Sequence, residues 1–145
     1  MRNTLKIVLL LSLAALLAAP AGARPSEAAD VEKEIGFGET VKIEDHLVKG
    51  KTVIVDFFSQ YCPPCRRISP LLTRLAEKRS DLFVLKVNIN RKDVRGIDWG
   101  SPVARQFKLE SVPHFIIYGA DGKVLAEGEA AFEKIERWLQ EAGIR

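Results

Sequence analysis

The chain has 145 residues, of which 22 are Lys or Arg and 19 are Asp or Glu. This near balance of charge argues against a nucleic-acid-binding protein, which needs basic residues clustered on one surface. The length suits one ordinary domain, which can bury a core without the help of disulfides.

The first 23 residues have the three parts of a cleavable secretory signal. Arg2 and Lys6 give a basic start, residues 7–19 form an apolar run, and the segment ends in Ala21-Gly22-Ala23. The run is shorter than the roughly 20 residues that span a bilayer, so we expect no stable membrane anchor.

We therefore predict a signal peptide over residues 1–23, a flexible leader over 24–38 and one domain over 39–145. Loss of the signal leaves 20 basic residues against 19 acidic ones, a net charge of +1. The expected location is the periplasm.

The first half of the domain predicts a short helical segment over 44–48 and then a strand, a helix and a strand. Residues 53–58 and 83–87 are nearly continuous apolar runs, which is typical of strands buried on both faces of a sheet. Apolar residues recur at helical spacing over 68–76. A strand, a helix and a strand in this order form a crossover connection, which places the two strands parallel.

The second half begins with Ser101-Pro102, a helix start with Ser as N-cap and Pro at the first helical position. A strand is expected over 115–118. Asp121-Gly122 is a hairpin signal that returns the chain through a strand at 124–126.

The last helix is expected over 132–142, where apolar residues share one face. The order of elements predicts an α/β fold: a single domain with a central mixed sheet and helices on both faces.

Cys62 and Cys65 are the only cysteines, and two prolines separate them. So short a loop stabilises little by chain entropy, which favours reversible disulfide chemistry over a structural staple. A zinc site would need two more ligands, and His46 and His114 lie far apart in the sequence. We predict a redox site without a metal or another cofactor.

Cys62 is expected at the start of a helix, where backbone N–H groups and the helix dipole stabilise a thiolate. It is the predicted nucleophile. Cys65, one turn further on, is the predicted resolving thiol, which breaks the mixed disulfide.

Asp56 lies in the middle of an apolar strand, so burial should raise its pKa. We interpret it as the proton acceptor, through water, for Cys65; a carboxylate satisfied by a nearby hydroxyl or water is the alternative. Lys86, inside the next strand, is the expected electrostatic partner of Asp56, or else an edge lysine whose ammonium reaches solvent.

Residues 55–66, Val-Asp-Phe-Phe-Ser-Gln-Tyr-Cys-Pro-Pro-Cys-Arg, resemble the active-site strand and loop of the thioredoxin family. The resemblance covers about residues 41–144 and includes Pro70, Lys86, Val112-Pro113 and Gly128. It implies the thioredoxin fold, protein-disulfide oxidoreductase activity and a redox disulfide between the two cysteines.

The resemblance also implies a cis peptide bond before Pro113, beside the two sulfur atoms. Substrate-binding positions are then Val112 and Pro113 of the cis-proline loop, together with Tyr61, Pro63 and Pro64.

Three positions depart from the cytoplasmic thioredoxin pattern. Tyr61 and Phe58 stand where that pattern has tryptophan, and Pro63 stands where it has glycine. The connection over 91–101 is longer than in the family, and its Trp99 is interpreted as a partly buried loop anchor, with a substrate-facing role as the alternative.

Pro63 and Pro64 lack the N–H groups that could stabilise a thiolate on Cys62. A less stabilised reduced form makes a better reductant, so we expect a protein similar to the TlpA-like reductants of the periplasm. It would reduce protein disulfides as a monomer and receive electrons from a membrane thiol-reductase. A disulfide oxidase or isomerase, or a non-catalytic binding module, is the alternative.

Overall fold

The computed structural model describes residues 30–145. The predicted signal peptide and the first part of the predicted leader lie outside the described residues. Within 30–145, every helix is too short or too polar to cross a membrane.

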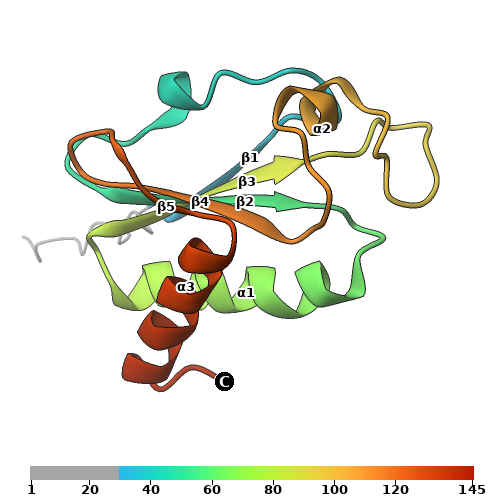
Figure 1. The fold of residues 1–145 in the computed structure, drawn as a ribbon. Coiled ribbons are helices and arrows are strands. Elements are labelled where there is room, and N and C mark those ends of the chain that lie inside the picture. The colour runs from blue at the N-terminus through green and yellow to red at the C-terminus, as the bar shows by residue number, and fades with distance from the viewer. Residues whose placement is uncertain (1–29) are drawn as a thin grey trace, which may run out of the picture.

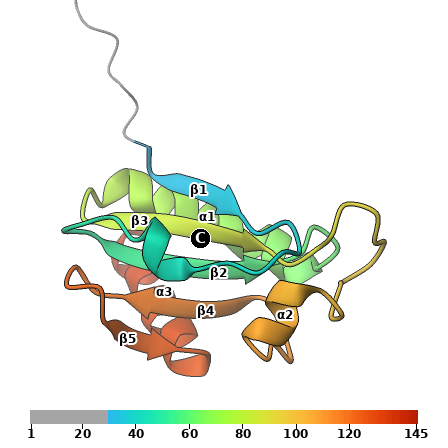
Figure 2. The ribbon, with the colours of Figure 1, turned by 90° about the horizontal axis from the view of Figure 1, so that it is seen from above.

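A five-stranded mixed sheet forms the centre of the domain (Figure 1). Strand β2 lies in the middle, parallel to β3 and antiparallel to β4. Figure 2 shows the order across the sheet, β1-β3-β2-β4-β5. The strands are β1 (Glu32–Ile35), β2 (Thr52–Phe58), β3 (Leu82–Asn88), β4 (His114–Tyr118) and β5 (Val124–Glu127).

Helices cover both faces of this sheet, as the order of elements predicts. Helices α1 and α3 lie against one face, and η1 and α2 lie over the other (Figure 1). They are the 3-10 helix η1 (Ile43–His46) and the α-helices α1 (Pro63–Lys78), α2 (Pro102–Gln106) and α3 (Glu129–Glu141). The predicted fold class is confirmed.

Strand β2 is buried on both faces because its side chains alternate between two hydrophobic clusters. Val55 and Phe57 belong to the cluster on the η1 and α2 face. Ile54 belongs to the cluster formed with α1 and α3. Asp56 follows Ile54 by two residues, so its side chain lies on the α1 face of the sheet.

The prediction of a flexible leader over 24–38 was wrong at its C-terminal end, because β1 lies within it. This strand pairs in parallel with β3 along the edge of the sheet. Three of its four residues are charged and only Ile35 is buried, so β1 is held mainly by backbone pairing and shows no apolar pattern.

Gly36 ends β1 with a φ of 93°. A Cβ at this position would lie 2.9 Å from the carbonyl oxygen of Asn88. A side chain is therefore excluded both by the backbone conformation and by the close approach of β3.

Helix α1 begins at Pro63, directly after Cys62, as predicted, and continues through Pro70 to Lys78. Its first turn holds the Cys62–Cys65 segment at the carboxyl end of β2.

Candidate active site

Cys62 and Cys65 form the expected disulfide, with their Cα atoms 5.3 Å apart. Cys62 is the N-cap of α1, and Cys65 lies in its first turn. Each cysteine is only 1% exposed in this oxidised state, so burial does not distinguish the nucleophile from the resolving thiol. The predicted roles rest on the helix position of Cys62.

One backbone N–H is directed at the sulfur of Cys62. The Cys65 N–H donates to this Sγ at 3.1 Å. Pro63 and Pro64 occupy the intervening first positions of the helix and have no N–H to donate. The same Sγ lies 3.4 Å from the carbonyl oxygen of Val112, which can accept from the thiol of the reduced form but cannot stabilise the thiolate.

The peptide bond between Val112 and Pro113 is cis, as the resemblance implies. Both residues line a hollow of about 350 Å³ beside the disulfide, together with Pro64 and Phe132. The structure thus brings Pro64, Val112 and Pro113 together. Tyr61 precedes Cys62, and Pro63 is the first residue of α1; both are exposed, and neither lines this hollow.

Phe132, on α3, is partly buried and packs against the hydrophobic cluster formed with α1 and α3. Its ring stacks on Phe115 with centroids 6.2 Å apart. It also lines a second hollow of about 260 Å³, which shares Pro64 and Pro113 with the first. No sequence pattern distinguished Phe132 from its buried neighbours on α3.

Asp56 is fully buried, and burial raises its pKa to about 6. A hydrogen bond from Ser69 and the charge of Lys86 oppose this rise, and the charge of Glu32 adds to it. The Ser69 hydroxyl donates to Oδ2 of Asp56 at 2.5 Å. Oδ1 has no hydrogen-bond partner among residues 30–145. The predicted rise in pKa is confirmed.

Lys86 lies beside Asp56 in the register of β2 and β3. Its ammonium lies 3.8 Å from Oε1 of Glu32 and 5.5 Å from the ring centroid of Phe58. Lys86 therefore acts on Asp56 through its charge, while its direct ion pair is with Glu32. Ser69 supplies the nearby hydroxyl of the alternative interpretation of Asp56, although the sequence did not identify which residue it is. Glu32 lies in the predicted leader and was not expected near the site.

A third hollow, of about 280 Å³, lies between α1 and β3. Cys65, Ser69, Lys86 and Phe58 are among the residues that line it. The resolving cysteine, the hydroxyl that contacts Asp56 and the nearby ammonium thus share one cavity.

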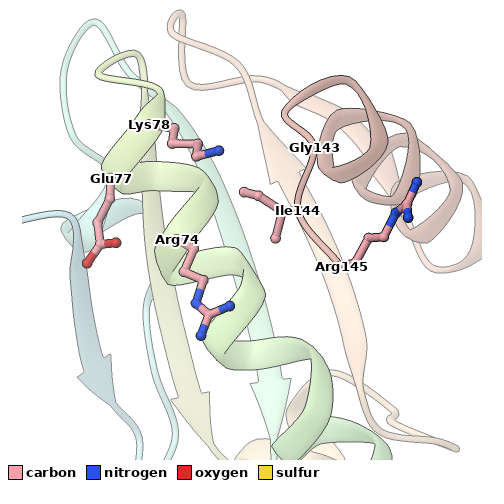
Figure 3. A pocket seen from close by; sticks show the side chains of 6 residues that line it. All are labelled: Arg74, Glu77, Lys78, Gly143, Ile144 and Arg145. Carbon is pink, nitrogen blue, oxygen red and sulfur yellow. The ribbon is translucent and has the colours of Figure 1, made fainter.

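A fourth hollow, of about 630 Å³, is larger than these three and lies between α1 and the end of the chain (Figure 3). None of the predicted site residues lines it. It is lined by Arg74, Glu77, Lys78, Gly143, Ile144 and Arg145. Its size therefore does not mark the redox site.

The long connection over 91–101 is anchored by Asp98, not by Trp99 as the sequence had indicated. Asp98 is 4% exposed. Its Oδ2 accepts from Nε of Arg91 at 2.8 Å and its Oδ1 from Nη2 at 3.0 Å. Trp99 is 42% exposed.

His114 lies at the start of β4, directly after the cis-proline. Its Nε2 is 3.5 Å from Oε1 of Glu127, which is too long for a strong hydrogen bond. Within residues 30–145, no three His, Cys, Asp or Glu side chains are grouped so that they could hold a metal ion.

Comparison with known proteins identifies the family. The thioredoxin family model matches residues 37–141. An H-type thioredoxin of Brassica campestris is 31% identical over 98 residues, which are 68% of this chain and 73% of that protein. A thioredoxin of Mycolicibacterium smegmatis is 35% identical over 92 residues, which are 60% of this chain and 77% of that protein.

Comparison with solved structures also finds thioredoxins. The short form of thioredoxin f from spinach chloroplast has a TM-score of 0.53 and 25% identity, and the match covers 80% of this chain and 96% of that one. The reduced thioredoxin of Schistosoma mansoni has a TM-score of 0.53 and 27% identity, with 76% and 96% covered.

The sheet order, the Cys62–Cys65 disulfide at the start of α1 and the matched family model lead to one conclusion. The protein is a thioredoxin-like protein-disulfide oxidoreductase, and the chain belongs to the thioredoxin family.

Proposed function

We propose that this protein is a periplasmic reductant of the TlpA-like kind, which reduces disulfides in client proteins. The observation that carries the proposal is the environment of Cys62. Among residues 30–145, the Cys65 N–H is the one backbone donor that reaches its sulfur, at 3.1 Å, and the two residues between the cysteines are prolines without an N–H.

Few donors at Cys62 mean little stabilisation of its thiolate. The reduced dithiol is then stabilised little relative to the disulfide, so the cysteine pair gives up electrons more readily. Arg66 and Arg67 favour the thiolate, but both are exposed and their charges are screened by salt.

The reaction consists of two exchanges that move two electrons to the client. The Cys62 thiolate attacks a client disulfide and forms a mixed disulfide, and the other client sulfur leaves as a thiolate. Cys65 then gives its proton to Asp56 and attacks the Cys62 sulfur. The second client thiolate leaves, and the Cys62–Cys65 disulfide remains.

The proposed location rests on the basic start, apolar run and Ala-x-Ala ending of residues 1–23. In the periplasm, a membrane thiol-reductase would return electrons to the oxidised pair, and the protein would work as a monomer. A thioredoxin f2 that is 27% identical, with a TM-score of 0.51, has been solved in complex with ferredoxin:thioredoxin reductase. That complex supports dependence on a reductase partner.

Equilibrium of the purified protein with glutathione buffers tests the direction of electron flow. We expect a reduction potential close to or below the roughly −270 mV of thioredoxin. A value near the roughly −120 mV of the strong periplasmic oxidants would overturn the assignment and favour a disulfide oxidase.

A further inference from the structure

The buried carboxylate of Asp56 is surrounded by four elements of the fold. Strand β3 supplies Lys86, β1 supplies Glu32, and α1 supplies Ser69. Strand β4 places the uncharged Phe115 opposite Asp56. Ser69 and Glu32 have no role in the mechanism described above.

We propose that Ser69 and Glu32 are opposed positioning residues, which together set how readily Asp56 takes the proton of Cys65. Ser69 stabilises the carboxylate by direct contact. Glu32 destabilises it by its own charge and by holding the ammonium of Lys86. The inference rests on the proposed role of Asp56 as proton acceptor and is independent of the direction of electron flow.

The contact between Ser69 and Asp56 is short and shielded from solvent. Ser69 is 6% exposed, and its hydroxyl donates to Oδ2 at 2.5 Å. A hydrogen bond to a buried carboxylate stabilises the ionised form. Because the hydroxyl occupies Oδ2, the oxygen left to accept a proton is Oδ1, which has no partner within residues 30–145.

Glu32 acts from the edge strand in the opposite sense. Its Oε1 lies 3.8 Å from Nζ of Lys86, and its Oε2 accepts a hydrogen bond from the hydroxyl of Thr73 on α1. Lys86 and Thr73 thus hold the carboxylate of Glu32 beside the ammonium of Lys86. Its negative charge reduces the attraction between Lys86 and the ionised Asp56.

The hollow between α1 and β3 lies next to this network. Cys65, Ser69 and Lys86 line it, whereas the fully buried Asp56 lies behind Ser69 and does not. Its volume of about 280 Å³ has room for water. The hollow beside the cis-proline is lined by other residues, including Val112 and Pro113. Proton transfer and client binding therefore use different sides of the disulfide.

In the resolving step, the Cys65 proton passes to Oδ1 of Asp56 while the Cys65 sulfur bonds to Cys62. The bond between Cys62 and the client breaks, and the client leaves as a thiolate. Asp56 afterwards releases its proton to solvent, so the step needs no additional oxidant or reductant.

The reduced protein and 5,5′-dithiobis(2-nitrobenzoate) allow this step to be timed. Cys62 releases the first thionitrobenzoate, and Cys65 releases the second as the disulfide closes. The rate of the second release should rise with pH as Asp56 ionises. Ser69→Ala should move the midpoint of that rise up by about one pH unit, because the carboxylate loses a hydrogen bond.

Glu32→Gln should move the midpoint in the other direction, down by about half a unit, because Lys86 then acts on Asp56 without a competing charge. Glu34→Gln is the matched control. Glu34 lies opposite Lys86 in the register of β1 and β3, but its carboxylate accepts from Asn88 at 3.0 Å. Its substitution should leave the midpoint in place.

Ser69→Thr, which keeps the hydroxyl, should restore the midpoint that Ser69→Ala moves. Carboxyl NMR titration of Asp56 in the oxidised protein gives the same shifts without any activity. If Ser69→Ala does not fold, two other variants test the proposal. Glu32→Gln should lower the midpoint, and Lys86→Met should raise it because the carboxylate loses a nearby positive charge.

Shifts of the same sign in Ser69→Ala and Glu32→Gln, or no shift in either, would overturn the proposal. An unchanged pH profile in Asp56→Asn would overturn it as well, by removing Asp56 as the acceptor. The reductant assignment would survive both results, since the reduction potential tests it separately.

Discussion

Lys86 lies opposite Asp56 in the parallel register of β2 and β3, yet its ammonium pairs with Glu32 at 3.8 Å. The buried carboxylate depends instead on the hydroxyl of Ser69. The fold thus holds an acid with a pKa of about 6 beneath the helix that carries both cysteines.

Asp56 makes the stability of the oxidised protein depend on pH. Its pKa is 3.8 in the unfolded chain and about 6 in the fold, so the folded state binds the proton more tightly. Below about pH 4 Asp56 is protonated in both states and does not lower the free energy of unfolding. As pH rises from about 4 to about 6, the unfolded chain loses this proton while the folded protein keeps it. The free energy of unfolding should therefore fall by about 2–3 kcal/mol over this range and stay level above it.

Asp56→Asn should remove this loss, because the amide oxygen can still accept from Ser69 but carries no charge. Urea unfolding at pH 4 and pH 8 measures both proteins. We expect equal stability of the variant at the two values, apart from changes common to both proteins. A wild-type protein more stable than Asp56→Asn at pH 8 would contradict the account.

Pro63→Gly should make the active site more oxidising. It restores a free backbone N–H at the start of α1, which adds to the positive end of the helix and so stabilises the thiolate. The reduction potential should rise by about 30 mV, the equivalent of one charge-assisted hydrogen bond. Pro102→Gly, at the same position of α2, should leave the potential unchanged.

Cys65→Ser should accumulate mixed disulfides with client proteins, because Cys62 can attack but nothing resolves the product. Non-reducing gels of periplasmic extract, followed by mass spectrometry, detect the complexes. Cys62→Ser is the matched variant and should trap few of them. The reverse pattern would exchange the roles of the two cysteines.

The edge strand β1 is expected to contribute to stability. Ile35 is its single buried residue and belongs to the cluster on the η1 and α2 face. Ile35→Ala should cost about 2 kcal/mol in the free energy of unfolding, measured with urea. Lys33→Ala, an exposed position on the same strand, should change it little. Equal effects would mean that β1 is held by backbone pairing alone.

Much of this fold could be predicted because its inner strands are buried on both faces. The apolar runs of β2 and β3 identify them without any partner in view. Strand β1 could not be predicted, because an edge strand with three charged residues shows no hydrophobic pattern.

The candidate site also has a part that the sequence predicts and a part that it does not. Cys62 and Cys65 form a local motif and Asp56 interrupts an apolar strand, so the sequence itself reveals them, whereas Pro113 was expected only from the resemblance to the thioredoxin family. Ser69 and Glu32 become partners of the site only through the packing of α1 and β1 against the sheet.

The redox state of the pair inside the cell tests the central claim most directly. The full chain can be expressed in a bacterium with a periplasm. The cells are quenched with acid, and free thiols are labelled with a maleimide of high molecular mass. The account predicts a periplasmic protein in which both Cys62 and Cys65 take the label, because a reductase keeps them reduced. A periplasmic protein that stays unlabelled, with its disulfide closed at steady state, would contradict a reductant and favour an oxidase.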